Sequence, residues 1–266
     1  MSNEGTQKTL LVALGVCLVC SILVSGAAVG LKGIQDRNRE LDKLKNILQA
    51  GDLYSEGADI KKVYEERIRP EIVELSSGTL LTSDRYDAVL DPAAFDLKAI
   101  AKNPAYSRVL PADVDKAQIK SAPNFMVIYE VMDQDQVQKY ILPIVGKGLW
   151  STMYGFIALD KDLSTVRGFT FYGHGETPGL GGEVDNPRWK QIWNGKQIFD
   201  ESGELKIEVI KSSVDPDSPD AKYEIDGLSG ATITTRGVDA TVKFWLGENG
   251  FGPFLAKLRG GVADHE

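Results

Sequence analysis

An uncharged apolar run near the N-terminus constrains this chain more than any other feature of its sequence. The run extends from Thr9 to Leu31 and reads TLLVALGVCLVCSILVSGAAVGL. As a helix that rises about 1.5 Å per residue, it is long enough to cross a hydrocarbon core of roughly 30 Å. A cleaved signal peptide has a shorter apolar region, of about 7–15 residues, behind a basic lead. The run therefore predicts a retained transmembrane helix.

This helix divides the chain into four predicted parts: a short N-terminal tail (1–8), the transmembrane helix (9–31), a helical stalk (32–69) and an α+β domain (70–266). In the stalk, apolar residues such as Leu41, Leu44 and Leu48 recur at helical intervals between charged residues. This spacing favours an amphipathic continuation of the membrane helix.

The charges beside the apolar run do not decide its orientation. Lys8 precedes the run, whereas five basic residues follow it within a short distance: Lys32, Arg37, Arg39, Lys43 and Lys45. A positive-inside count alone would keep the large domain in the cytoplasm. Long domains, however, are translocated largely regardless of such charges.

Composition excludes several kinds of site from the main body of the chain. Both cysteines, Cys17 and Cys20, lie in the apolar run, and His174 stands alone in the body, since His265 lies at the C-terminus. A cysteine-based zinc or iron–sulfur site is therefore excluded there. The net charge of -8 and the pI of about 5.0 argue against nucleic-acid binding. Chemistry in this domain would need a borrowed cofactor.

The pattern after residue 58 predicts a mostly antiparallel, twisted sheet with helices packed on it. Asp59 should cap a helix that extends to Arg69 and ends at Pro70. Hairpins are expected around Ser77-Gly78 and around DQDQ (133–136), and two more strands on either side of DKDLS (160–164). Further expected elements are a short helix in NPRWKQIW, a strand in ELKIEVIK and a final helix with Val238, Val242, Trp245 and Leu246 on one face.

The first of three stretches that could carry chemistry is DGLSGATITTRGV (226–238). Its hydroxyl residues, Ser229, Thr232, Thr234 and Thr235, precede a helix that is expected to begin near Arg236. A helix N-terminus attracts phosphate through its unpaired N–H groups, and Gly230 allows a ligand to approach the backbone. Ordinary N-capping by one hydroxyl is the alternative.

The second stretch is the glycine-rich YGHGETPGLGGEV (172–184). Such a loop suits close backbone contact with a flat ligand, and His174, Glu176 and Thr177 are expected at its rim. Pro178 interrupts the position where a dinucleotide-binding helix should continue, so a nicotinamide site is not expected. A purely structural loop stays open as the alternative.

The third stretch is GKGLWSTMYGF (146–156). Lys147 is not followed by Ser or Thr, so the stretch is not a phosphate-binding P-loop. Trp150, Tyr154 and Phe156 could flank an aromatic ligand or could belong to the core of the sheet. A hydrolase that pairs His174 with Ser151 is disfavoured, because no G-x-S-x-G elbow is present.

DGLSGATITTRGV resembles the D-G-x-S/T-G-A-T motif of proteins that carry covalent FMN. The resemblance implies that Thr232 takes the FMN phosphate as an ester, from FAD, through a separate flavin transferase. The segments GLWSTMYGF, HGETPGLGGEVDNPRW and FWLGENGFGPFL together resemble the C subunit of the sodium-translocating NADH:quinone oxidoreductase of bacterial membranes. This likeness extends over nearly the whole chain.

The resemblance implies an electron-carrying subunit of a complex that oxidises NADH, reduces ubiquinone and pumps Na+. It implies a single-pass anchor in the lipid of the inner membrane, a periplasmic FMN-binding α+β domain, and partner subunits that include a second FMN carrier and a flavin–iron–sulfur subunit. No metal site and no catalytic residue are expected in this chain. The implied cofactor-binding residues are Thr232, Ser229, Gly230, Ala231, Leu149, Trp150, Glu176, Thr177, Gly179 and Leu180.

Two other functions stay open at this point. One keeps the flavin but assigns the chain to the G-type subunit of the related ferredoxin:NAD oxidoreductase. The other is a membrane-anchored assembly or ligand-binding module without a redox role, which the apolar run, the stalk and the acidic domain would equally support.

Overall fold

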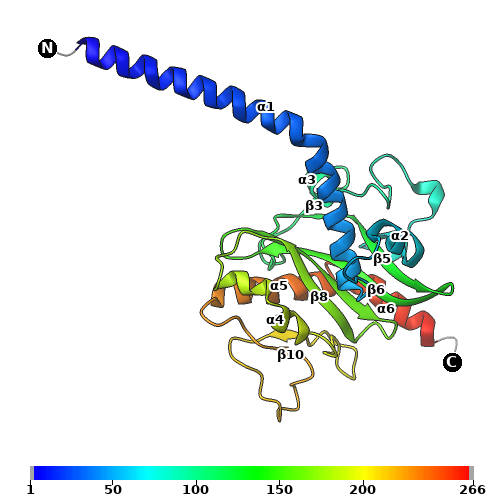
Figure 1. Cartoon of the computed structure of the whole chain (residues 1–266). Helices are drawn as coiled ribbons and strands as arrows, with labels where there is room; N and C mark the ends of the chain where they lie inside the picture. Colours follow the sequence, from blue (N-terminus) through cyan, green and yellow to red (C-terminus); the bar gives the residue numbers. More distant parts are fainter. Residues whose placement is uncertain (1–2, 264–266) are drawn as a thin grey trace. The chain divides into compact units, whose positions relative to one another are not determined.

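The computed structural model describes residues 3–263 and divides into two units, residues 1–43 and residues 44–266. α1 (Asn3–Ala50) is one continuous helix that runs through the first unit and ends in the second (Figure 1). Its most apolar 18-residue window has a mean hydropathy of 2.6, and its large apolar side chains from Leu10 to Ile34 are exposed. α1 is therefore a candidate membrane span that continues as a helix into the predicted stalk.

α2 (Ile60–Arg67) is capped as the sequence predicts, but it ends earlier than expected. The Asp59 carboxylate accepts a hydrogen bond from the Lys62 N–H at 3.2 Å. Pro70 does not end the helix; it lies inside β1 (Ile68–Glu74), opposite Tyr129 of β5. Proline is tolerated near the edge of a sheet, and burial of Ile68 and Ile72 favours the strand.

The main sheet has the strand order β2-β1-β5-β6-β7-β8, and each neighbouring pair is antiparallel. In that order the strands are Thr79–Leu80, Ile68–Glu74, Phe125–Asp133, Gln136–Lys147, Thr152–Asp160 and Val166–Gly173. The predicted hairpins and the α+β fold class are thus confirmed.

Short elements connect and cover this sheet. They are η1 (Ser83–Arg85), α3 (Leu97–Lys102), β3 (Ser107–Val109), β4 (Ser121–Pro123), η2 (Gly181–Asp185), α4 (Pro187–Gln191), β9 (Glu208–Val209) and β10 (Glu224–Ile225). The strand predicted in ELKIEVIK is wrong in extent, because β9 pairs with β10 over two residues only. α4 begins at Pro187, as predicted.

α5 (Thr232–Leu246), orange in Figure 1, packs against β6. It begins four residues before the predicted start near Arg236, because the chain turns at Gly230 (φ +73°) and Ala231 is already the N-cap. The Trp245 indole N–H donates to the Val145 carbonyl at 2.7 Å. α6 (Gly252–Ala263) was not expected from the sequence, although its Phe254 and Leu255 are buried.

Glycines allow the close contact between α5 and β6. A Cβ at Gly237 would lie 2.3 Å from the Lys147 carbonyl oxygen, and a Cβ at Gly146 would collide with the Thr241 side chain. The backbone of α5 therefore meets the end of β6 directly at Gly237, and β6 makes room for the Thr241 side chain at Gly146. These contacts fix where α5 begins relative to the residues that follow β6.

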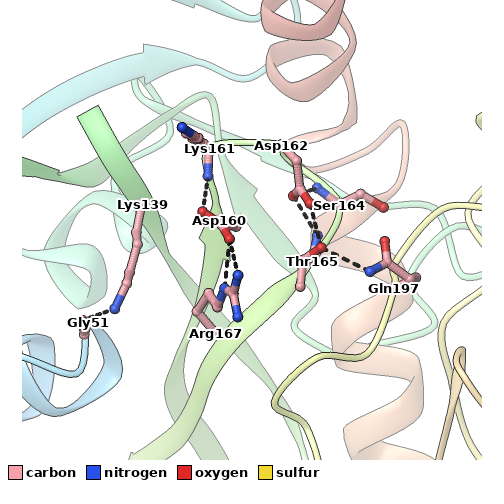
Figure 2. A network of polar contacts seen from close by, with 9 residues as sticks. All are labelled: Gly51, Lys139, Asp160, Lys161, Asp162, Ser164, Thr165, Arg167 and Gln197. Atoms are coloured by element: carbon pink, nitrogen blue, oxygen red, sulfur yellow. Dashed lines mark hydrogen bonds and ion pairs between the residues drawn. The ribbon is translucent and has the colours of Figure 1, made fainter. Parts of the chain in front are cut away.

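The C-terminal end of α1 covers the other face of the sheet. Gly51 lies against the Ile141 side chain, and Ile141 is five residues from Gly146, so the two project to opposite faces of β6. Figure 2 shows Lys139 of β6 donating to the Gly51 carbonyl at 2.8 Å, and Asp160 of β7 accepting from Arg167 of β8. These contacts secure the end of α1 and the β7–β8 hairpin.

We expect Gly237→Ala to lower the free energy of unfolding by about 1–3 kcal/mol, since the added methyl must displace α5 from β6. Gly260→Ala in α6 is the matched control, because a Cβ there meets nothing within 4 Å and alanine gains about 0.5–1 kcal/mol in a helix. Urea unfolding followed by tryptophan fluorescence measures both changes. Equal stability of the two variants would contradict the close packing.

Candidate functional site

The three stretches singled out in the sequence meet at the carboxylate of Glu176. Its Oε1 accepts hydrogen bonds from the N–H groups of Trp150 (3.0 Å) and Ser151 (3.1 Å). Its Oε2 accepts from the Leu149 N–H (3.1 Å) and from the Thr234 hydroxyl (2.7 Å). One side chain therefore joins the β6–β7 loop, the glycine-rich loop and the first turn of α5.

Glu176 does not lie at the rim of its loop, as the sequence suggested; it is 5% exposed. Burial raises the pKa of its carboxyl, but the hydrogen bond from Thr234 and those from the three backbone N–H groups lower it by more. The pKa consequently lies below the ordinary value of 4.5, and the group is an anion at neutral pH. Both carboxylate oxygens are occupied, and their hydrogen bonds link the three segments.

Two glycines give the carboxylate its space. A Cβ at Gly148 would lie 2.6 Å from Oε1 of Glu176, and a Cβ at Gly181 would lie 2.5 Å from the Thr234 hydroxyl oxygen. Both positions are buried. A side chain at either position would therefore open the contact between loops, which explains glycine there without any unusual backbone angle.

The four hydroxyl residues of the 226–238 stretch have separate roles. Thr234 and Thr235 are buried: the first donates to Glu176, and the second accepts from the Leu228 N–H at 3.0 Å. Ser229 and Thr232 are exposed, and the Thr232 hydroxyl has no hydrogen-bond partner among residues 3–263. Thr232 therefore presents a free hydroxyl at the surface.

Thr232 is also the first residue of α5, where backbone N–H groups are unpaired. The first intrahelical bond runs from the Thr235 N–H to the Ala231 carbonyl at 2.9 Å, and no side chain caps the helix at Ala231. The alternative of ordinary N-capping by a hydroxyl is therefore wrong for α5. The free N–H groups and the positive end of the helix dipole favour a phosphate next to Thr232.

Four exposed apolar side chains belong to the three segments that meet at Glu176, and we name them together the apolar rim. They are Leu149 (42% exposed), Trp150 (66%), Leu180 (46%) and Ile233 (56%). Leu180 follows Gly179, whose φ is +75°. The Leu180 Cδ2 atom lies close to the turn at Gly230, since a Cβ added at Gly230 would be 3.2 Å from it. Such a rim suits the flat face of an aromatic ligand.

Ile233 was missed by sequence reasoning, although its position beside Thr232 on α5 could have suggested it. Thr177 is exposed, and its carbonyl accepts from the N–H of Gly182 at 2.9 Å. Phe156 belongs to the core instead of the ligand surface, since it is 2% exposed and stacks on Tyr172 with a 4.9 Å centroid distance. Tyr154 is half-buried beneath the Lys98 ammonium.

Glu176→Gln should lower the free energy of unfolding by about 2 kcal/mol at pH 7, because an amide presents a donor to groups that already donate. The lowered pKa means that the ionised group contributes its full stability above pH 4.5 and loses it as the pH falls through its value in the folded protein. The difference from the unmodified protein should therefore shrink in acid.

Urea unfolding at pH 7 and at several acidic pH values measures this difference. Glu183→Gln on the same loop is the control, with a cost below about 1 kcal/mol, because Glu183 accepts from the Asn186 side-chain amide near the surface. A Glu176→Gln cost that stays constant down to strongly acidic pH would show that the charge of Glu176 does not secure the loops.

A family model described as "FMN-binding domain" matches residues 148–247, a region that includes Leu149, Glu176 and Thr232. A solved structure of NqrC from Shewanella oneidensis superposes with a TM-score of 0.74 at 32% identity, covering 84% of this chain and 99% of that one. The solved C subunit of the Na+-translocating NADH-quinone reductase from Parabacteroides distasonis gives 0.63 at 29% identity, covering 85% and 96%.

Relatives named as C subunits of Na+-translocating NADH-quinone reductases match along almost the entire chain. The protein from Pseudomonas aeruginosa is 49% identical, with 98% of this chain and 99% of the relative covered. The protein from Yersinia pestis is 46% identical, with 98% and 96% covered. The chain therefore belongs to the family of C subunits of Na+-translocating NADH-quinone reductases.

Proposed function

We propose that Thr232 carries FMN through a phosphate ester on its side-chain oxygen. The observation that supports this most directly is the exposed, unpartnered Thr232 hydroxyl at the uncapped start of α5, inside the region that matches the FMN-binding domain. In the attachment reaction, a flavin transferase binds FAD, and the Thr232 oxygen attacks the phosphorus of its FMN half. AMP leaves, and the hydroxyl proton is released.

The surroundings of Thr232 fit a phosphate and a flat ring. The N–H groups of the first turn of α5 would stabilise the charge of the phosphodiester. Ser229, Gly230 and Ala231 form the turn that brings Thr232 to the surface. The apolar rim, with Thr177 and Gly179 on the neighbouring loop, would support the ring and keep water from one of its faces.

FMN would supply the electron chemistry, and the residues of this chain would position it. The covalent bond makes a deep pocket unnecessary, because the ring cannot diffuse away. Glu176 has no free oxygen with which to act as an acid or base. Its role in this proposal is to keep the Leu149–Ser151 segment and α5 at a fixed separation.

The proposed role in the cell is electron transfer within a complex that oxidises NADH, reduces ubiquinone and moves Na+. The names of the full-length relatives support this assignment over the G-type subunit of a ferredoxin-dependent complex. The match to an FMN-binding domain disfavours a module without a redox role. Its partners would be the other subunits of the complex, including a second FMN carrier and a flavin–iron–sulfur subunit.

α1 would anchor the protein in the lipid of the bacterial inner membrane, with the flavin domain in the periplasm. Its exposed apolar surface supports the anchor. A membrane-impermeant maleimide tests the orientation on variants that lack Cys17 and Cys20: Glu201→Cys, whose native side chain is 96% exposed, should react in intact cells. Lys8→Cys, before the span, should react only after lysis. The reverse pattern would place the domain in the cytoplasm.

We expect Thr232→Ala to abolish covalent flavin without unfolding the domain, because the Thr232 hydroxyl makes no hydrogen bond within residues 3–263. The full-length chain is co-expressed with a flavin transferase, denatured, and examined by in-gel flavin fluorescence and intact mass. Ser213→Ala is the matched control, since it removes an exposed hydroxyl outside the 226–238 stretch and should keep the flavin. A fluorescent Thr232→Ala band would refute the proposed attachment residue.

A further inference from the structure

His174 directly follows β8 at the start of the glycine-rich loop, and both of its ring nitrogens have partners. Its side chain is 12% exposed. Nδ1 accepts a hydrogen bond from the Glu176 backbone N–H at 3.2 Å, and Nε2 lies 2.7 Å from Oδ2 of Asp185. The histidine therefore contacts the backbone of the residue whose carboxylate joins the three loops.

These two contacts indicate which ring nitrogen of His174 carries the proton. Because Nδ1 accepts from an N–H group, it carries no proton itself, so the proton is on Nε2 and is donated to Asp185. The contact with Asp185 is then a hydrogen bond from Nε2 to a carboxylate. This arrangement of carboxylate, imidazole and backbone orients the ring in the same way as a carboxylate orients a metal-ligating or catalytic histidine.

Asp185 is itself held in place. Its Oδ1 lies 3.1 Å from the Lys190 ammonium of α4, and Lys190 donates to the Thr170 hydroxyl of β8 at 3.0 Å. Thr170 is 5% exposed, so this series of contacts ends inside the sheet. His174 is thus connected to a rigid part of the domain, whereas the loop that it supports is rich in glycine.

The loop is also held from its other side. The Ser151 hydroxyl accepts from the Gly175 N–H at 2.6 Å, and the Ser151 N–H donates to the Glu176 carboxylate. Residues 174–176 therefore lie between the β6–β7 loop and the Asp185–Lys190 pair. Loss of the bond at Nδ1 would leave the Glu176 N–H without its acceptor. The backbone of Glu176 could then move, and its carboxylate would move with it.

We propose that His174 is a positioning residue for the flavin site. Its imidazole Nδ1 fixes the backbone of Glu176 and, through the Glu176 carboxylate, the Leu149–Ser151 segment and the start of α5. The inference concerning the flavin rests on the proposed attachment at Thr232, whereas the effect on the loops does not depend on the flavin.

The experiment compares His174→Asn with His174→Gln in the full-length chain. Asparagine can place its side-chain oxygen near the position of Nδ1 and keep the acceptor for Glu176, whereas glutamine reaches toward Asp185 and loses that acceptor. In the flavin-free protein, amide hydrogen exchange of Leu149, Trp150, Ser151 and Glu176 should speed up by about 5-fold in His174→Gln, the loss expected for one hydrogen bond. His174→Asn should match the unmodified protein.

The second measurement uses protein flavinylated by a co-expressed transferase. His174→Gln should retain covalent flavin but change its visible circular dichroism and its reduction potential, while His174→Asn keeps both near the unmodified values. Equal behaviour of the two variants, or the reverse order, would overturn the proposal. If the unmodified chain carried no flavin, the attachment proposal would fail, and the exchange measurement would still decide the role of His174.

Discussion

The buried carboxylate of Glu176 determines how the loops of this site are arranged. A buried anion is costly unless it is well hydrogen-bonded, and here the compensation comes from three backbone N–H groups and the Thr234 hydroxyl. The backbone donors lie more than twenty residues before Glu176 in the sequence, and Thr234 lies more than fifty residues after it. The Glu176 carboxylate receives all of these hydrogen bonds only when the three segments meet. The site therefore forms together with the hydrogen bonds to Glu176.

The surface of the site follows from this arrangement. Since Thr234 and Thr235 are turned inward to form hydrogen bonds, Thr232 is turned outward at the first position of α5. Its hydroxyl is then free beside unpaired helical N–H groups. Leu149 and Trp150 donate to Glu176 through their backbones, and Ile233 adjoins Thr234, which also donates to it. The apolar side chains of all three residues are exposed. A tethered ring on such a surface would stay accessible to a redox partner, as an electron carrier requires.

Sequence patterns predicted helices, strands and turns correctly where neighbouring residues determine them. Alternating strands, the Asp59 cap and the turn at Ser77-Gly78 all have signals within a few residues, and the structure confirms them. Pro70 was misread because sheet pairing at a distance outweighs its usual effect on helices. Glu176 was placed at the rim because its burial depends on donors that are remote in sequence. The resemblance identified the family. The exposed position of Ile233 and the contacts of His174 could not be predicted from a motif, because they depend on how distant segments pack.

Nuclear magnetic resonance of the flavin-free chain across acidic pH tests the role of Glu176 most directly. The backbone N–H signals of Leu149, Trp150 and Ser151 should shift together with the Glu176 carboxyl, because all three donate to it. Their common midpoint should lie below pH 4.5, as the hydrogen bonds to the anion require. Independent midpoints, or a common midpoint above pH 4.5, would contradict a carboxylate that holds the three segments together.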